Sequence, residues 1–195
     1  YFLMGDQTWC NRAFDGSHGR GIIGLSFGIE ERDMWSELIS QKFKLPVKLY
    51  DCFIPPAQSP PIAGKLPNGT KKCSGLDFIC YANTYTPYRW CLAAQEISVE
   101  GKWYTTLIAQ LKGLPRLSVH LKIDVEGSEW AVLEQLMDSP EDWDKIRTLD
   151  MEIHFGSSSL AELPQYKDQA EVPKLERQVA IMERLTEKFH CTGST

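Results

Sequence analysis

Apolar runs alternate with amphipathic segments along this chain, and the alternation predicts an α/β fold with a mostly parallel sheet. The apolar runs read as strands at 22–27, 47–51, 89–98, 121–126 and 148–155. The segments with apolar residues at helical spacing read as helices at 34–44, 104–111, 129–137 and 173–189. Residues 22–27 are almost all apolar, which is typical of a central strand covered on both faces. The pattern favours a Rossmann-like three-layer α/β/α sandwich.

The first strand, the first helix and the second strand form a compact unit over residues 21–53. Gly28 ends the first strand, Asp33 is placed to cap the helix, and Asp51 closes the second strand. This order is that of the nucleoside-binding half of a Rossmann-like fold, and the spacing from Gly28 to Asp51 suits an acid that hydrogen-bonds ribose hydroxyls. The G-x-G-x-x-G motif of dinucleotide enzymes is absent, which argues against a pyrophosphate-bearing cofactor.

The whole chain, 1–195, is expected to form a single domain. An irregular lead-in, 1–20, precedes the unit at 21–53, and the remaining strands and helices fill 89–195. Between them, 54–88 is rich in proline and lacks periodicity, which predicts a long excursion over the carboxyl edge of the sheet, where it would set substrate choice. In the last helix, the apolar stripe expected to pack in the core consists of Leu175, Val179, Met182, Leu185 and Phe189.

Two strands that should be neighbours each carry polar residues on one side. These residues are Lys122, Asp124 and Glu126 in the first strand, and Asp150, Glu152 and His154 in the second. Charges inside a covered sheet are costly unless they are paired, so Lys122 and Glu152 are expected to neutralise each other. Asp124, Glu126 and His154 lie nearer the carboxyl edge and are the better candidates for a substrate site.

His154 is the best candidate for a catalytic base, because the ordinary pKa of histidine is about 6.5. A satisfied core histidine is the competing interpretation, and Glu126 is the alternative base. Asp124 with Glu126 or with His154 could also hold a divalent cation such as magnesium, but so few candidates define no metal site and none is assigned. Gly127 permits a tight exit from the strand, and Ser128 is placed to cap the following helix.

Composition and charge narrow the class of protein. The chain is 43% hydrophobic and 24% charged, as in ordinary globular domains. A net charge of -5 and a pI of about 5.4 argue against a nucleic-acid partner, whose binding surface would be basic. No apolar run is long enough for a membrane span and no signal peptide is visible, although the first and last residues suggest a fragment of a longer protein.

The cysteines leave the cellular compartment open. None of the six forms a C-x-x-C pair or a zinc-finger spacing. Cys73 and Cys80 could bridge in an oxidising compartment, and reduced thiols are equally compatible with the sequence. The triplet 68–70 (NGT) is a glycosylation sequon only in a secreted protein, so a secretory or Golgi location and a cytoplasmic location are both possible.

Residues 121–130 (LKIDVEGSEW), taken with 26–29 (SFGI) and 33–37 (DMWSE), resemble the signature of FkbM-type S-adenosylmethionine-dependent methyltransferases, above all a eukaryotic methyltransferase-like branch. The resemblance spans roughly 5–155 and leaves 54–88 unmatched. It implies a class I methyltransferase fold, whose last antiparallel strands would be missing from this chain, and S-adenosylmethionine as cofactor. The implied reaction transfers a methyl group to an oxygen or nitrogen of a small-molecule or carbohydrate acceptor.

The resemblance and the strand positions together assign a role to each candidate residue. The cofactor residues are Ser26, Phe27 and Gly28 at the first turn, Asp51 at the ribose, Asp124, and Glu96 or Ile97 near the adenine after the third strand. The catalytic residues are His154, Asp124 and Glu126. Two other functions stay open: a nicotinamide-dependent oxidoreductase, which the missing glycines disfavour, and a non-catalytic binding domain, which would bind the cofactor without transferring a methyl group.

Overall fold

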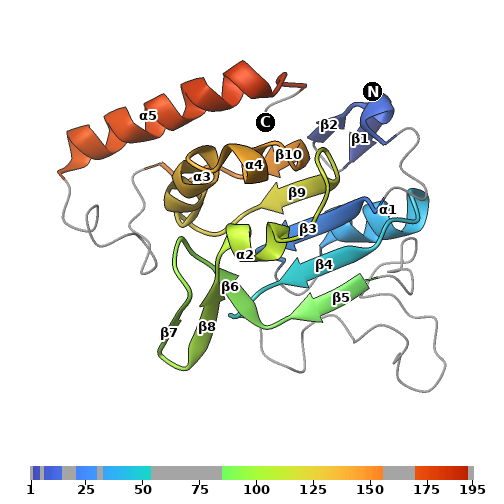
Figure 1. Ribbon diagram of the computed structural model, residues 1–195, viewed down its shortest axis with the longest axis horizontal. Coiled ribbons are helices and arrows are strands. Elements are labelled where there is room, and N and C mark those ends of the chain that lie inside the picture. The colour runs from blue at the N-terminus through green and yellow to red at the C-terminus, as the bar shows by residue number, and fades with distance from the viewer. Residues whose placement is uncertain are drawn as a thin grey trace.

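The computed structural model describes residues 2–4, 7–14, 21–29, 33–53, 85–155 and 170–192. At its centre lies a five-stranded sheet in the order β10-β9-β3-β4-β5 (Figure 1). The strands are β3 (Ile23–Phe27), β4 (Val47–Tyr50), β5 (Tyr85–Tyr88), β9 (Val119–Ile123) and β10 (Ile146–Met151). Every neighbouring pair in this sheet is parallel, so the predicted α/β sheet is confirmed.

Helices cover both faces of the sheet and divide the core into two main clusters. The helices are α1 (Met34–Lys42), α2 (Leu107–Leu111), α3 (Glu129–Met137), α4 (Pro140–Trp143) and α5 (Glu171–Lys188). On one face, Trp35 and Ile39 of α1 cluster with Val47 of β4. On the other face, buried residues of α2, α3 and α5 cluster with Leu25 of β3. These three layers are those of the predicted Rossmann-like α/β/α fold.

The third parallel strand is not where the sequence predicted it. Residues 89–98 do not form one strand, because β5 ends at Tyr88 and a second, three-stranded sheet begins immediately afterwards. That sheet has the order β6-β8-β7 and contains β6 (Trp90–Leu92), β7 (Ile97–Val99) and β8 (Lys102–Thr105). Pro87 concealed β5 from the sequence pattern, although the edge position of β5 tolerates a residue without an N–H donor.

Two further boundaries change as a result. The excursion predicted for 54–88 is too long, because 85–88 belongs to the sheet. Residues 54–84, which include Cys73, Cys80 and the sequon at 68–70, lie outside the described part of the chain. The helix predicted from 104 begins at Leu107, because Tyr104 belongs to β8.

The lead-in is more ordered than predicted. Its described residues contain an antiparallel pair, β1 (Phe2–Met4) and β2 (Gln7–Trp9), and a 3-10 helix, η1 (Asn11–Ala13). Phe14 follows and stacks on the ring of His120 in β9, with ring centroids 4.2 Å apart. The lead-in is therefore tied to the sheet on the face that α1 covers.

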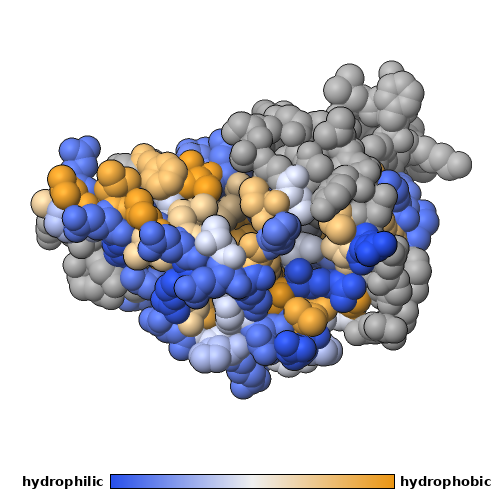
Figure 2. All heavy atoms as spheres, turned by 90° about the horizontal axis from the view of Figure 1, so that it is seen from above, coloured by the Kyte–Doolittle hydropathy of each residue, from blue (hydrophilic) through white to orange (hydrophobic). Residues whose placement is uncertain are grey.

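The apolar stripe predicted for the last helix is wrong in part. Leu175 is 49% exposed and Val179 is 46% exposed, whereas the buried residues of α5 are Lys174, Gln178, Ile181 and Leu185. Polar anchors set this rotation: Arg177 pairs with Glu134 of α3 at 3.3 Å, and Arg184 donates to a carbonyl at the end of α3. Figure 2, seen from the α5 side, shows apolar side chains gathered on part of this surface. No helix among the described residues is long and apolar enough to span a bilayer.

A disulfide that the sequence did not predict joins the two sheets. Cys52 follows β4, Cys91 lies in β6, and their Cα atoms are 5.0 Å apart across a separation of 39 residues. Cys52 and Ile97 pack against the small cluster formed by Cys91, Ala93 and Tyr104. The disulfide therefore fastens the second sheet beside the carboxyl end of β4.

Candidate functional site

The carboxyl edge of the sheet contains a point where the strand order reverses. β3 lies between β4, which follows it in the chain, and β9, which belongs to the second half. In open α/β sheets, ligands bind in the crevice outside the carboxyl ends of the strands at such a switch point. The segments after β3 and β9 meet there, because the backbone N–H of Asp124 donates to the carbonyl of Phe27 at 3.0 Å.

Gly28 is the residue at which these two segments approach most closely. Its φ is +75°, in the left-handed region that favours glycine. A Cβ atom at this position would lie 1.5 Å from the carbonyl oxygen of Asp124, so no side chain fits. Its backbone N–H donates to the carbonyl of Tyr50, which ties the same turn to β4.

The side chains of Ser26 and Phe27 are committed to the fold. Ser26 is fully buried, and its hydroxyl donates to Oδ2 of Asp33 at 2.6 Å. Asp33 caps α1 as predicted, accepting from the backbone N–H of Ser36 at 3.2 Å and from the Ser36 hydroxyl. The ring of Phe27 is buried and stacks on Tyr50 with centroids 4.4 Å apart. At these two positions, only the backbone is left to face a ligand at the edge.

Asp51 lies at the end of β4 and joins two turns. Its Oδ2 accepts from the backbone N–H of Ile29 at 3.1 Å, and its Oδ1 accepts from that of Phe53 at 2.8 Å. The carboxylate is half-buried at the same edge as Gly28. Its partner Ile29 belongs to the turn after β3, so the acid is held beside the switch point.

The strands β9 and β10 end earlier than predicted, which moves the candidate polar residues off the sheet. β9 ends at Ile123 and β10 ends at Met151, and these two residues are register partners. Asp124 and Glu152 therefore leave the sheet side by side, and the backbone N–H of Glu152 donates to the carbonyl of Ile123 at 3.0 Å. Asp124, Glu126, Glu152 and His154 lie in segments beyond the edge, whereas Lys122 and Asp150 remain in the strands.

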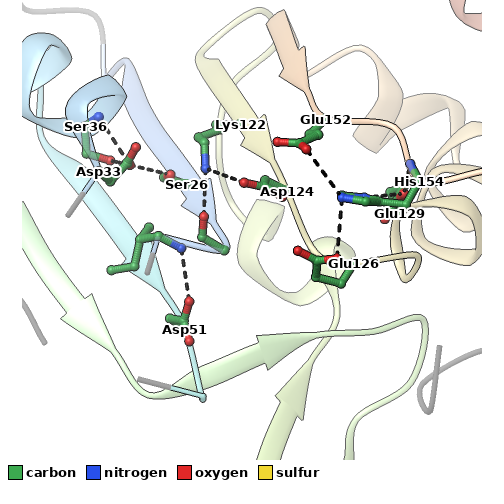
Figure 3. A network of polar contacts seen from close by, with 12 residues as sticks. Ser26, Asp33, Ser36, Asp51, Lys122, Asp124, Glu126, Glu129, Glu152 and His154 are labelled. Carbon is green, nitrogen blue, oxygen red and sulfur yellow. Dashed lines mark hydrogen bonds and ion pairs between the residues drawn. The ribbon is translucent and has the colours of Figure 1, made fainter. Parts of the chain in front are cut away.

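Lys122 pairs with Asp124 and not with Glu152 (Figure 3). Its Nζ donates to the carbonyl of Gly28 at 2.7 Å and lies 3.6 Å from Oδ2 of Asp124. The predicted Lys122–Glu152 pair is wrong, because the carbonyl of Gly28, in the turn after the neighbouring β3, accepts from the ammonium group and holds it near the switch point.

His154 is held by a buried carboxylate that sequence reasoning did not single out. Glu129, the first residue of α3, is fully buried. Its Oε1 accepts from the backbone N–H of His154 at 2.8 Å and lies 3.1 Å from Nδ1 of the ring (Figure 3). Its Oε2 accepts from Gly127 at 2.8 Å, and the indole N–H of Trp130 donates to the carbonyl of His154 at 2.9 Å. The sequence signal that could have identified Glu129 is its place within residues 121–130, next to Trp130.

The ring of His154 points its second nitrogen toward other carboxylates. Nε2 lies 3.6 Å from Oε2 of Glu126 and 3.7 Å from Oε1 of Glu152. Partial burial acts to lower the pKa of His154, but Glu129, followed by Glu126 and Glu152, outweighs it and raises the pKa above its ordinary value. The ring therefore keeps its proton to a higher pH than a free histidine does, and above that range its free nitrogen can accept a proton.

The turn between β9 and α3 brings Glu126 to this position. Glu126 is exposed and has a φ of +51°, which is uncommon for a residue with a side chain. Ser128 precedes α3 but its side chain makes no capping hydrogen bond, so the predicted cap is wrong. Glu129 instead accepts from the N–H of Gly127 at the start of the helix.

Glu96 and Ile97 lie in the second sheet. Glu96 is exposed immediately before β7, and Ile97 packs against the cluster around the disulfide. The predicted place of Glu96 and Ile97 beside an adenine depended on a single strand at 89–98, and the structure does not have that strand. The residues that follow the third parallel strand are Arg89 and Trp90.

An aromatic row that the sequence did not reveal crosses this end of the sheet. Ring centroids are 5.0 Å apart between Tyr50 and Tyr88, and 4.9 Å apart between Tyr88 and Trp90. Tyr50 is buried, which strongly raises its pKa, with a smaller contribution from Tyr88, and its hydroxyl donates to Gln110 at 2.7 Å. The row continues the Phe27–Tyr50 stack toward the half-buried Trp90.

Among the described residues, one group has the composition and spacing to hold a metal ion. Asp124, Glu152 and His154 each offer one ligand atom, and these atoms lie within 4.8 Å of one another. The structure thus brings together Gly28, Asp51, Asp124 and His154 from the ends of four adjacent strands. Comparison with family models, curated proteins and solved structures finds no match for this chain, so its function is argued from this geometry.

Proposed function

We propose that this chain is an S-adenosylmethionine-dependent methyltransferase that acts on an oxygen or nitrogen of a small-molecule or carbohydrate acceptor. One observation carries the proposal. The Gly28 turn, Asp51, Asp124 and His154 lie together at the switch point of a parallel sheet, and a buried carboxylate holds the histidine. A nucleoside-binding crevice and a proton acceptor then share one sheet edge.

The charges at this edge suit a cationic cofactor better than a phosphorylated one. Asp51 and Asp124 lie on either side of the Gly28 turn, and the ammonium of Lys122 is held against Asp124 and the Gly28 carbonyl. The turn after β3 contains a single glycine, without the glycine-rich loop that cradles a pyrophosphate. S-adenosylmethionine carries ribose hydroxyls, which a carboxylate can accept from, and a positive sulfonium.

The proposed reaction is a direct displacement at the sulfonium methyl group. S-adenosylmethionine, held by the Gly28 turn and Asp51, would supply a methyl group that an oxygen or nitrogen lone pair could displace, with the carbon–sulfur electron pair leaving on sulfur as S-adenosylhomocysteine. The acceptor's proton passes to Nε2 of His154, while Glu129 holds Nδ1 and balances the charge that forms. In-line positioning of the two reactants lowers the barrier for such transfers.

Calorimetric titration tests the cofactor assignment. We expect S-adenosylmethionine and S-adenosylhomocysteine to bind with micromolar dissociation constants and NAD not to bind. Asp51→Asn should weaken binding about tenfold or more, because a charged hydrogen bond contributes roughly 1.5–3 kcal/mol. The matched control is Asp138→Asn, a change at an exposed aspartate outside the site, which should leave binding unchanged.

Two results would contradict the proposal. The first is a folded chain that binds neither S-adenosyl compound. The second is tight binding of NAD, which would favour the oxidoreductase. Binding of S-adenosylmethionine without methyl transfer to any tested acceptor, together with indifference to His154→Ala, would instead favour the non-catalytic binding domain.

A further inference from the structure

Backbone register brings Asp124 and Glu152 together. β9 and β10 are parallel neighbours whose last paired residues are Ile123 and Met151, so the next residue of each strand leaves the sheet at the same place. The hydrogen bond from the N–H of Glu152 to the carbonyl of Ile123 fixes this arrangement. The two carboxylates and the ring of His154 present their ligand atoms within 4.8 Å of one another.

The ring orientation of His154 points to a cation as the missing partner. In the neutral ring with Nδ1 donating its hydrogen to Glu129, which is fully buried, Nε2 carries a lone pair. That lone pair faces Oε2 of Glu126 at 3.6 Å and Oε1 of Glu152 at 3.7 Å, and carboxylate oxygens are acceptors as well. Histidines that bind metals usually donate their other ring N–H to a carboxylate in this way.

The balance of charge agrees with this geometry. The carboxylates of Asp124, Glu126, Glu129 and Glu152 surround the ring of His154. Lys122 is the lysine in contact with Asp124, and its ammonium group also donates to the carbonyl of Gly28, at 2.7 Å. Lys122 supplies one positive charge, 3.6 Å from Asp124, against the four carboxylates around the ring, so the cluster keeps negative charge for a second cation.

We propose that Asp124, Glu152 and His154 bind a divalent first-row transition cation, with Glu126 in reach as a fourth ligand. One imidazole nitrogen with two or three carboxylate oxygens suits Mn²⁺, Fe²⁺ or Zn²⁺ better than Ca²⁺, which prefers oxygen ligands alone. This ligand set comes from the segment after β9 and the segment after β10.

The role of such a cation, though not its binding, rests on the proposed methyltransferase function. A cation here would lower the pKa of an acceptor hydroxyl that approaches the edge. The nitrogen Nε2 of His154 cannot be a metal ligand and a proton acceptor at once. With a metal bound, His154 would therefore not take up the acceptor's proton, which would pass to solvent water once the cation had lowered the pKa of the hydroxyl. The alternative occupant of the same position is a proton on Nε2.

Titration of the chelator-treated full chain with Mn²⁺, followed by calorimetry and by loss of the free-ion electron paramagnetic resonance signal, tests the site. We expect saturable binding of one equivalent at neutral pH. Asp124→Asn, Glu152→Gln and His154→Ala should each weaken it by about tenfold or more. Glu141→Gln removes an exposed acid outside the cluster and should leave binding unchanged. Circular dichroism and thermal unfolding establish that each variant is folded.

The same samples separate this inference from the proposed function. Absence of saturable binding, or equal binding by the Glu152→Gln and Glu141→Gln variants, would overturn the metal site. S-adenosylhomocysteine binding measured in parallel reports on the methyltransferase assignment alone. A chain that binds one Mn²⁺ but no S-adenosyl compound keeps the metal site and loses the proposed function. A chain that binds S-adenosylhomocysteine but no Mn²⁺ keeps the proposed function and loses the metal site.

Discussion

At the scale of single residues, Gly28 is the position with the least freedom to change. Gly28→Ala would place a methyl group 1.5 Å from the Asp124 carbonyl in a backbone conformation with φ of +75°. We expect a loss of about 2–5 kcal/mol in the free energy of unfolding, from left-handed strain and overpacking together. Urea denaturation measures this loss, and S-adenosylhomocysteine titration of the folded fraction should show weaker binding.

Gly113 provides the matched control for this prediction. Its φ is +76°, and a Cβ atom there would have no neighbour within 4 Å. Gly113→Ala carries the same backbone strain without the steric clash, so it should cost only about 1–2 kcal/mol. Equal losses in the two variants would mean that the contact between Gly28 and Asp124 does not constrain the chain.

His120 predicts how stability responds to acid. Burial, assisted by the charge of Arg147, lowers the pKa of His120 from 6.5 to about 3. Between these values the unfolded chain binds a proton that the folded chain does not bind, so stability falls as the pH drops from 6.5 toward 3. The contribution is on the order of 4 kcal/mol. Chemical denaturation across this range should show a shallower pH dependence for His120→Phe, and an unchanged slope would contradict the assignment.

The sequence predicted the position of the candidate residues at the sheet edge where a local rule applied, and failed to predict their contacts where the partner was distant. Gly28 and Asp51 follow from the ends of strands, and the alternation of polar residues placed Asp124 and His154 near the same edge. Glu129 was missed because an acid at the start of a helix is usually exposed, and only the fold brings His154 to it. Whether these residues bind a cofactor stays a prediction.

At the scale of elements, the disulfide between Cys52 and Cys91 predicts a dependence on reductant. Reduction, or the double variant Cys52→Ser and Cys91→Ser, frees a loop of 39 residues in the unfolded chain. By the loop-entropy relation this lowers the free energy of unfolding by about 4 kcal/mol. Denaturation with and without dithiothreitol measures the effect. Identical midpoints for the oxidised and reduced chains would show that the bond makes no contribution.

Helices and strands were predicted correctly where local residues set their ends, and incorrectly where contacts with distant elements set them. β3, α1, β4 and α3 are bounded by local signals such as the Asp33 cap, and all four were found. β5 was missed because it contains a proline, which a strand tolerates only at the edge of a sheet. The sequence pattern does not show which strand lies at the edge. The rotation of α5 was mispredicted because Arg177 and Arg184 anchor it to α3, leaving Leu175 and Val179 exposed.

At the scale of the whole molecule, the strand order matters more to the proposed function than any single side chain. The order β10-β9-β3-β4-β5 puts residues from both halves of the chain at one edge. The alternation of strands and helices predicted the layers, and the switch point followed only once the order was known. The residues of β9 alone do not predict that its neighbours are β3 and β10, because strand pairing depends on residues far away in the sequence.

The pairing of β3 with β9 also has a consequence for how the chain folds. Ile23 pairs with Val119 and Phe27 with Ile123, so the two central strands are separated by nearly half of the sequence. Closing so long a loop costs conformational entropy before the contacts between the strands form. Pairing of β3 with β9 should therefore be slower than formation of the local β3-α1-β4 unit. During synthesis, one side of β3 therefore stays unpaired until the second half of the chain has been made. The crevice at Gly28 forms only after β9 pairs with β3.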